Sequence, residues 1–445
     1  MNPKKCQKNE NSLIFGADIN EVDQNILKNA NCFFVYANQV ANHLSVIRII
    51  KYLKENFNTK PVIVLENSQA VTAYSLSVIR NEFLNIGCDY IIVGDLEKSA
   101  LQLYNNLNQK EKIQNIQGII SKEFVNDKIN FVENLDSLHF PAWEDFPLEN
   151  YWELGYSHGP ISNKKYLPIL TSRGCPYPCN FCVVPKTNER KWRSRTPNNM
   201  LNEIKFWQNK LGITEFHFED LNPTVNDKRT KEFCKLLIKE NIKIEWKIVA
   251  GTKVESIKDD ETIELLSRAG CKYISISPES GSKQVMQNIN KPFNYQHALK
   301  SVKKMNEQKI FTQACFIIGY PEEKKVDLIQ TRKMIFDLTK RGIDEIAVFI
   351  ITPIPGSSIY GKFEGFSTLS NLTFTPTWRK DYKKLYKERL IMYFIFLCTK
   401  LIFHPIKMFK QIVNFFRKRF DTKMEMVPFK VLRLKTFENA KKIKN

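Results

Sequence analysis

The most distinctive stretch of the sequence places three cysteines within eight residues. The segment from residue 171 to 186 reads TSRGCPYPCNFCVVPK, with Cys175, Cys179 and Cys182 at the spacing CxxxCxxC. Cysteine thiolates are soft ligands, and clustered ones favour zinc or iron–sulfur centres. The sequence therefore predicts a metal centre in this loop.

Zinc suits the loop less well than an iron–sulfur cluster. A structural zinc site takes four protein ligands, but Cys234 is remote and neither His158 nor His217 stands at finger spacing. Pro176 and Pro178 exclude a helix and stiffen the loop. Three thiolates on a four-iron cluster leave one iron open to an outside ligand, which is an arrangement for catalysis. A structural zinc or a chance cluster remains the alternative.

The elements before this loop predict a small α/β domain. Short apolar runs at residues 32–37, 61–65 and 90–94 are typical of buried strands. Helical periodicity between and after them predicts helices at 43–56, 73–87 and 99–107. This alternation predicts a Rossmann-like domain with a parallel sheet covered on both faces. We place it at residues 1–130, followed by an ordered aromatic linker at 131–166.

A second alternation of strands and helices begins at Leu167. Six strands are expected, each separated from the next by helical periodicity: 167–172, 215–220, 244–250, 273–280, 312–320 and 345–353. This pattern predicts a partial (β/α)6 barrel of the TIM type at residues 167–375. Glu219, Asp220, Glu279 and Glu322 follow strands, at the edge where barrel enzymes assemble their sites.

The last region, residues 376–445, is predicted to be helical, apolar and basic. Its uninterrupted apolar stretch, residues 390–399, is too short to span a bilayer, and Lys400, His404 and Lys407 interrupt the apolar residues after it. Two interpretations remain open. The helices either cap the barrel or the first domain, or include one that lies on an anionic membrane.

The composition adds limits on location and partners. A net charge of +20 over 445 residues attracts phosphate, anionic lipid or nucleic acid without choosing among them. Ten cysteines without a framework of pairs, after a polar start, predict a reducing cytoplasm. The single cysteines are expected to be small buried hydrophobes: Cys88, Cys234, Cys271, Cys315 and Cys398.

The position of CxxxCxxC directly after the first barrel strand resembles the signature of the radical S-adenosylmethionine (radical SAM) superfamily. The resemblance implies that Cys175, Cys179 and Cys182 hold a four-iron four-sulfur cluster, and that Phe181 lies near the adenine of S-adenosylmethionine. The segment FHFEDLNPT is similar to the family segment that meets the amino group of this cofactor, which implicates Glu219 and Asp220.

Two later segments extend the resemblance over most of the predicted barrel. SISPESGS is similar to the polar segment near the ribose, which implicates Glu279 and Ser280. FIIGYPEE resembles the adenine-side motif, which implicates Ile318, Gly319 and Pro321. The alternatives are a solvated strand end for the carboxylates of Glu219 and Asp220, and a buried structural carboxylate for Glu279.

The first domain, the linker and the segment WRSRTPNNMLNEI resemble the radical SAM enzymes that carry an N-terminal cobalamin-binding domain. That domain is truncated or degenerate in this sequence, because the DxHxxG motif and the early strand–helix units are absent. Cobalamin is therefore only a possible further cofactor. The resemblance does not supply the identity of the substrate.

The resemblance implies reductive cleavage of S-adenosylmethionine to a 5′-deoxyadenosyl radical, used to methylate or rearrange a small-molecule or lipid-like substrate. A flavodoxin or ferredoxin would supply electrons, and nucleic acid is not expected as a partner. Two alternatives stay open. One is a methylthiotransferase acting on tRNA or protein, which the basic charge would suit, and the other is a noncatalytic protein that binds a cluster.

Overall fold

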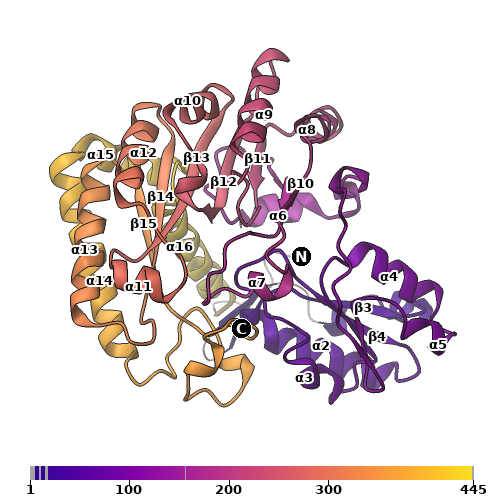
Figure 1. Ribbon diagram of the computed structural model, residues 1–445. Coiled ribbons are helices and arrows are strands. Elements are labelled where there is room, and N and C mark those ends of the chain that lie inside the picture. The colour runs from indigo at the N-terminus through magenta and orange to yellow at the C-terminus, as the bar shows by residue number, and fades with distance from the viewer. Residues whose placement is uncertain (1–5, 10–11, 16–18, 156, 443–445) are drawn as a thin grey trace.

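The computed structural model describes residues 6–9, 12–15, 19–155 and 157–442. A five-stranded sheet occupies the N-terminal part and a six-stranded sheet the middle, and Figure 1 shows the cysteine loop and α7 (Val184–Thr187) between these two parts. Residues 1–5 and 443–445, at the outer ends of the predicted first and last domains, lie outside the described residues.

The N-terminal sheet has the order β3-β4-β5-β6-β7, with β3, β4 and β5 parallel and β6 and β7 antiparallel. The three predicted strands are confirmed. The antiparallel edge was not predicted, because strands of two residues carry no readable period. The strands are β3 (Phe33–Ala37), β4 (Val62–Glu66), β5 (Tyr90–Ile92), β6 (Ile119–Ile120) and β7 (Val125–Asn126), and β1 (Cys6–Asn9) pairs with β2 (Ser12–Phe15) in a separate hairpin.

Two of the three helices predicted in this domain lie close to where the periodicity places them. The third prediction, 73–87, is wrong over its first half, since the helix starts only at Arg80. The amide of Leu76 instead donates to the Glu66 carboxylate at 2.7 Å, and the amide of Ser75 donates to the carbonyl of Pro355 at 3.0 Å. The helices are α1 (Gln24–Asn29), α2 (His43–Asn56), α3 (Arg80–Leu84), α4 (Leu96–Asn105) and α5 (Lys110–Ile113).

The aromatic linker is ordered and packs on the barrel. It contains α6 (Leu148–Leu154), in which the buried Trp152 donates from Nε1 to the carbonyl of Tyr166 at 2.7 Å. Short 3-10 turns complete it and recur elsewhere: Ile19–Glu21, Val40–Asn42, Leu135–Ser137, Trp143–Asp145, Val254–Ser256, Tyr360–Lys362 and Leu369–Asn371.

The six predicted barrel strands are confirmed as one parallel sheet, in the order β15-β14-β13-β12-β11-β8. This order is that of a partial TIM-type barrel, as predicted. The strands are β8 (Leu167–Ile169), β11 (Glu215–Phe218), β12 (Glu245–Thr252), β13 (Cys271–Glu279), β14 (Phe311–Ile318) and β15 (Glu345–Ile350).

Most barrel helices begin directly after a polar residue that caps their first turn. The side chains of Thr196, Asn226, Asp259 and Asn294 each accept a hydrogen bond from an amide of the first turn, which satisfies a donor that the helix itself leaves free. The helices are α8 (Pro197–Leu211), α9 (Asp227–Lys239), α10 (Asp260–Arg268), α11 (Lys283–Asn288), α12 (Tyr295–Glu307) and α13 (Lys325–Lys340).

The C-terminal helices are α14 (Tyr382–Phe403), α15 (Pro405–Arg417) and α16 (Lys423–Lys442). Helix α14 covers α13 and β15, burying Met392 and Phe396, and the Arg332 guanidinium binds both carboxylate oxygens of Glu388. Among the described residues, no single helix has the length and hydropathy of a membrane span. Helices α14 and α15 have the length and hydropathy of a membrane span only when they are taken together, and a bend of 111° separates them.

Candidate functional site

The cysteine loop lies at the carboxyl end of β8, closed at its base by the pairing of β9 (Ser172–Arg173) with β10 (Arg193–Ser194). Gly174 begins the loop with φ of +77°, and a Cβ there would lie 1.9 Å from the carbonyl oxygen of Lys191. Only glycine fits this position. The chain therefore turns sharply before the first cysteine.

The three thiols are mostly shielded from solvent and close to one another. Burial raises the pKa of Cys179 to about 11 and also raises the pKa of Cys175 and Cys182, and a charge on one of these sulfurs would raise the pKa of the next. The amide of Cys182 donates to the carbonyl of Cys179 at 3.2 Å. Thiols in such surroundings become thiolates when they bind metal, because the metal replaces the proton.

The described residues contain no group of three His, Cys, Asp or Glu side chains that could hold a single metal ion. A four-iron cluster makes a different demand, since each cysteine binds a different iron and the sulfurs need not converge on one point. The assignment of a cluster instead of a mononuclear zinc to Cys175, Cys179 and Cys182 stays a prediction.

An aromatic wall with unpaired polar atoms stands beside the loop. Phe181 meets Tyr320 edge to face, with ring centroids 5.8 Å apart. The buried Tyr320 hydroxyl has no hydrogen-bond partner within the part of the chain that the structure describes, and the same holds for Asn180 Oδ1 and Ser357 Oγ. Buried polar atoms are rarely left unpaired. A polar ligand bound at this place would supply the missing partners.

A buried ion pair lies next to the cysteines. Lys291 Nζ contacts Glu279 Oε1 at 2.5 Å and donates to the carbonyl of Ser277 at 2.9 Å. Burial opposes the charge of Lys291, but Glu279 together with Cys179 and Cys175 outweighs burial and raises the pKa of the lysine.

Glu279 itself ends β13 in a left-handed conformation, with φ of +60°. Such backbone costs about 1–3 kcal/mol in a residue other than glycine. The ion pair therefore holds the end of β13 in a fixed, strained position beside the cysteine loop.

Glu219 and Asp220 are neighbours in sequence but lie in different surroundings. Glu219 remains partly exposed, and its carboxylate contacts Nδ1 of His158, from the linker, at 2.8 Å. Asp220 is buried and accepts hydrogen bonds from the amide and hydroxyl of Thr171 and from the hydroxyl of Ser172, the last at 2.6 Å. Asp220 thus ties the end of β11 to the start of the cysteine loop, and its contact with the cofactor stays a prediction.

The remaining predicted site residues follow two strands: Ser280 lies after β13, and Ile318, Gly319 and Pro321 lie at and after the end of β14. Ser280 is buried, and its hydroxyl lies 3.0 Å from that of Thr331 on α13. Gly319, with φ of +86°, follows Ile318 at the end of β14 and directly precedes Tyr320 of the aromatic wall. Their roles toward ribose and adenine, like that of Pro321, stay predictions.

A cavity of about 340 Å³ adjoins Glu219 and has mostly aromatic and apolar walls. Its volume lies in the range of small-molecule sites. The linker supplies most of the lining, and β8 and β11 the rest: Trp143, Phe146, Leu148, Tyr151, Trp152, Ser157, His158, Tyr166, Leu167, Pro168, His217 and Glu219.

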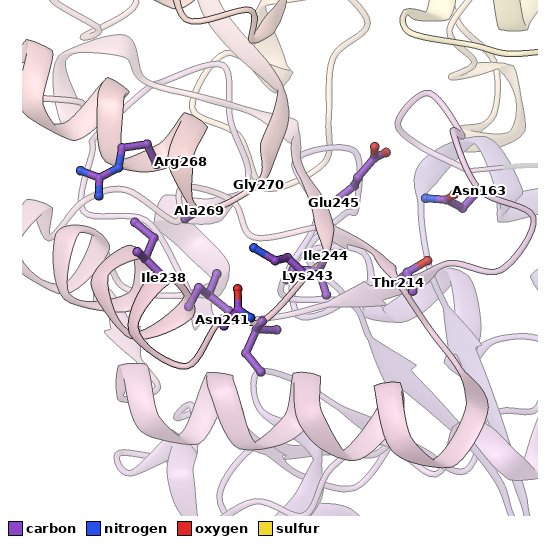
Figure 2. Close-up of a pocket in the computed structure, with 12 residues that line it drawn as sticks. Asn163, Thr214, Ile238, Asn241, Lys243, Ile244, Glu245, Arg268, Ala269 and Gly270 are labelled. Atoms are coloured by element: carbon purple, nitrogen blue, oxygen red, sulfur yellow. The ribbon is translucent and has the colours of Figure 1, made fainter.

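A second cavity, of about 380 Å³, is lined by residues that precede or begin strands (Figure 2), among them Thr214, Lys243, Glu245 and Gly270. The cysteines follow the carboxyl end of β8, which is the opposite end of the parallel sheet. This second cavity is therefore not where a cluster-dependent reaction would take place.

The N-terminal domain contacts the cysteine loop directly. Gln69, after β4, accepts a hydrogen bond from the amide of Gly174 at 2.9 Å and donates to the Asn188 side chain at 3.0 Å. Asp95, after β5, binds the guanidinium groups of Arg173 and Arg193. Both interactions come from the carboxyl edge of the N-terminal sheet.

This edge is where a doubly wound domain binds its ligand, and several of its polar side chains already have partners within the protein. The Glu66 carboxylate, at the end of β4, accepts hydrogen bonds from the amides of Leu76 and Gly94 at 2.7 and 3.1 Å and so links β4 to the segment that follows β5. Val183 and Val184 of the radical SAM-like part are buried in the core of the N-terminal domain. The cysteine loop thus occupies the edge itself.

Sequence reasoning missed Lys291, Tyr320 and Gln69. Tyr320 stands inside the segment FIIGYPEE and could have been chosen as the aromatic residue after its glycine. Lys291 and Gln69 stand in no motif. The contact of Gln69 with Gly174 spans 105 residues and leaves no local pattern, and the pair of Lys291 with Glu279, 12 residues apart, matches no helix or strand period.

Known proteins share both the sequence pattern and the fold. Residues 169–335 match the model of the Radical SAM superfamily. An uncharacterized methyltransferase of Pyrococcus horikoshii is 26% identical over 298 residues, 66% of this chain and 61% of the relative. The anaerobic magnesium-protoporphyrin IX monomethyl ester cyclase of Synechocystis is 25% identical over 332 residues, 73% of this chain and 62% of the relative. The chain thus spans about three-fifths of the length of these two relatives.

The fold also matches a solved structure, the radical S-adenosylmethionine methyltransferase TsrM from Kitasatospora setae with cobalamin and a [4Fe-4S] cluster bound. The TM-score is 0.60 at 14% identity, over 76% of this chain and 67% of TsrM. At this identity the likeness concerns the fold alone. Residues 169–335, which contain the cysteine loop, therefore match a Radical SAM domain, and the fold around them is that of this solved structure.

Proposed function

We propose that this protein is an iron–sulfur enzyme that reductively cleaves S-adenosylmethionine and uses the 5′-deoxyadenosyl radical to methylate or rearrange a small-molecule or lipid-like substrate. The observation that carries the proposal is the stiff loop at the carboxyl end of β8, with three shielded thiols beside unpaired buried polar atoms. When bound, a [4Fe-4S] cluster supplies the electron for this cleavage.

Different residues around the loop bind the cluster and the separate parts of S-adenosylmethionine. Cys175, Cys179 and Cys182 hold the cluster, and Phe181 with Tyr320 excludes water from it. The adenine side is assigned to Ile318, Gly319 and Pro321, and the ribose side to Glu279. Glu219 meets the amino group of the cofactor.

Two further predicted cofactor residues also position strand ends in this proposal. Asp220 and Ser280 have hydrogen bonds to Thr171, Ser172 and Thr331. They hold the ends of β11 and β13, from which Asp220 would meet the amino group of the cofactor and Ser280 its ribose.

The cavity beside Glu219 supports the substrate class. Its aromatic walls favour an apolar molecule, because burying apolar surface there is stabilising by about 25 cal/mol per Å². A flavodoxin or ferredoxin is proposed as the electron donor. We also propose a cytoplasmic location with peripheral contact at the inner face of the membrane.

The methylthiotransferase alternative is less supported, since the two relatives described above are named as a methyltransferase and a cyclase. The noncatalytic alternative predicts a cluster without cleavage of S-adenosylmethionine. Activity measurements on the reconstituted protein separate it from the proposal.

The test uses full-length protein reconstituted without oxygen. Wild type should bind about four irons and form 5′-deoxyadenosine with dithionite. Cys179→Ala should lose the cluster and the product, and Cys398→Ala on α14 should retain both. A full cluster in Cys179→Ala would contradict the ligand assignment. A full wild-type cluster without product, with or without cobalamin, would favour the noncatalytic alternative.

A further inference from the structure

Helix α15 turns its polar side toward the protein. Lys407 Nζ binds Asp344 at 2.8 Å and the carbonyl of Gly342 at 3.0 Å, and Asn414 donates to Asp421 at 2.8 Å. Gln411 accepts a hydrogen bond from Lys400 at 2.7 Å. These contacts fix the rotation of the helix about its axis.

The opposite side of α15 is apolar and exposed. Ile406 is 83% exposed, Phe409 68%, Ile412 52% and Phe416 75%. Steps of three, three and four residues place these four side chains on one side of a helix. A surface helix of a soluble protein normally shows the reverse arrangement, with its apolar side against the core.

The apolar surface continues into the last turn of α14 through Leu401 and Ile402, which are 58% and 71% exposed. We name these six residues the apolar face: Leu401, Ile402, Ile406, Phe409, Ile412 and Phe416. In Figure 1, α15 lies at the periphery of the molecule, beside the barrel and away from the N-terminal domain. Contiguous exposed apolar surfaces of this kind mark interaction sites.

The charge around the apolar face favours one occupant. Between residues 382 and 420 the sequence has one acidic residue, Glu388, which Arg332 neutralises. The same stretch has ten basic residues, of which Lys400 is buried and Lys407 binds Asp344; the exposed cations beside the apolar face are Lys410, which also contacts Asp421, and Arg417, Lys418 and Arg419. Protein interfaces are depleted of lysine, whereas a basic helix with an apolar face is typical of binding to anionic lipid.

We infer that α15 lies in the interface of an anionic lipid bilayer, with the apolar face inserted and the basic residues on lipid phosphates. The inserted side would reach about 5–10 Å into the bilayer. Because α15 contacts Gly342 and Asp344, which precede β15, it lies at the end of the barrel away from the cysteine loop. Membrane binding therefore leaves the proposed reaction site free and does not depend on the radical chemistry.

Flotation of the full-length protein with vesicles tests this surface. Wild type should float with vesicles of phosphatidylcholine and phosphatidylglycerol, and less with phosphatidylcholine alone or in high salt. Ile406→Ser/Phe409→Ser should reduce the bound fraction by about fivefold or more, because it removes the inserted side chains. Arg417→Gln/Arg419→Gln should bind less and lose part of the salt dependence.

A matched control uses two equally exposed apolar residues of the N-terminal domain. Ile26→Ser/Leu101→Ser, whose side chains are 66% and 62% exposed in wild type, should float like wild type, and circular dichroism should show that all three double variants fold. Equal flotation of Ile406→Ser/Phe409→Ser and wild type would overturn the inference. The inference would also be overturned if wild type did not float with vesicles and light scattering showed that it self-associates through the apolar face.

Discussion

The Gln69 side chain of the N-terminal domain accepts a hydrogen bond from the backbone amide of Gly174, the residue before the first cysteine of the loop, at 2.9 Å. The same side chain donates to Asn188, which follows α7, at 3.0 Å. One glutamine thus holds both sides of the cysteine loop. The N-terminal domain acts here as a clamp on the loop.

Gln69→Ala should loosen this loop without unfolding the domain. Each lost hydrogen bond is worth about 0.5–1.5 kcal/mol, so local opening should become about tenfold more frequent. Hydrogen–deuterium exchange of the peptide covering residues 171–195 measures this in metal-free protein. Gln102→Ala, exposed on α4, is the control. Unchanged exchange in Gln69→Ala would show that the clamp lies elsewhere.

The contacts at the carboxyl edge of the N-terminal sheet predict that the protein does not retain cobalamin. The Glu66 carboxylate is bound by the amides of Leu76 and Gly94, and Asp95 is bound by Arg173 and Arg193. Reconstituted wild type, incubated with hydroxocobalamin and desalted, should show no corrinoid absorbance bands. Stoichiometric retention would mean that the edge opens, and Glu66→Ala would then be expected to alter the affinity.

The ion pair between Lys291 and Glu279 gives a prediction about stability. Lys291→Met leaves a buried carboxylate unpaired, which should cost about 3–5 kcal/mol. Lys291→Met/Glu279→Gln should recover most of this loss, since both charges are then absent. Thermal unfolding followed by circular dichroism compares them, with Lys272→Met, exposed on β13, as the control. If both Lys291 variants melt like wild type, the pair is not a stabilising contact.

The parts of the fold with local patterns were predictable from sequence, and the contacts between distant segments were not. The six barrel strands are short segments rich in apolar and β-branched residues between helical patterns, so the sequence places them close to where they lie. The segment 73–79 has helical periodicity, but the Glu66 carboxylate and Pro355 take its amides. Tertiary contacts overrode local preference there.

The candidate site shows the same division. The spacing of Cys175, Cys179 and Cys182 is visible in a single sequence, and all three lie in one loop of the structure. The different surroundings of Glu219 and Asp220 could not be read from sequence, because their partners, His158 and Thr171, come from distant segments of the chain. Likewise, the amphipathic pattern of α15 is visible, but not that its polar side faces the protein.

Lys400, which joins α14 to α15, predicts a dependence of stability on pH. It is buried and donates to the carbonyl of Asp344 and to Gln411. Burial lowers the pKa of Lys400 to about 8, against opposing effects of Asp344, Glu345 and Glu425, while Lys407 lowers it further. Between this value and the ordinary value near 10.5, the unfolded chain binds more protons than the folded one.

Stability relative to Lys400→Met should therefore rise as the pH increases from about 8 to 10.5, by up to about 3 kcal/mol. Denaturant unfolding of wild type and variant at pH 7.5, 9 and 10 measures the difference and cancels groups common to both proteins. Lys387→Met, exposed on the same helix, should show a difference that does not change with pH. A constant difference for Lys400→Met as well would mean that Lys400 titrates normally, with its ammonium in contact with water instead of buried between α14 and α15.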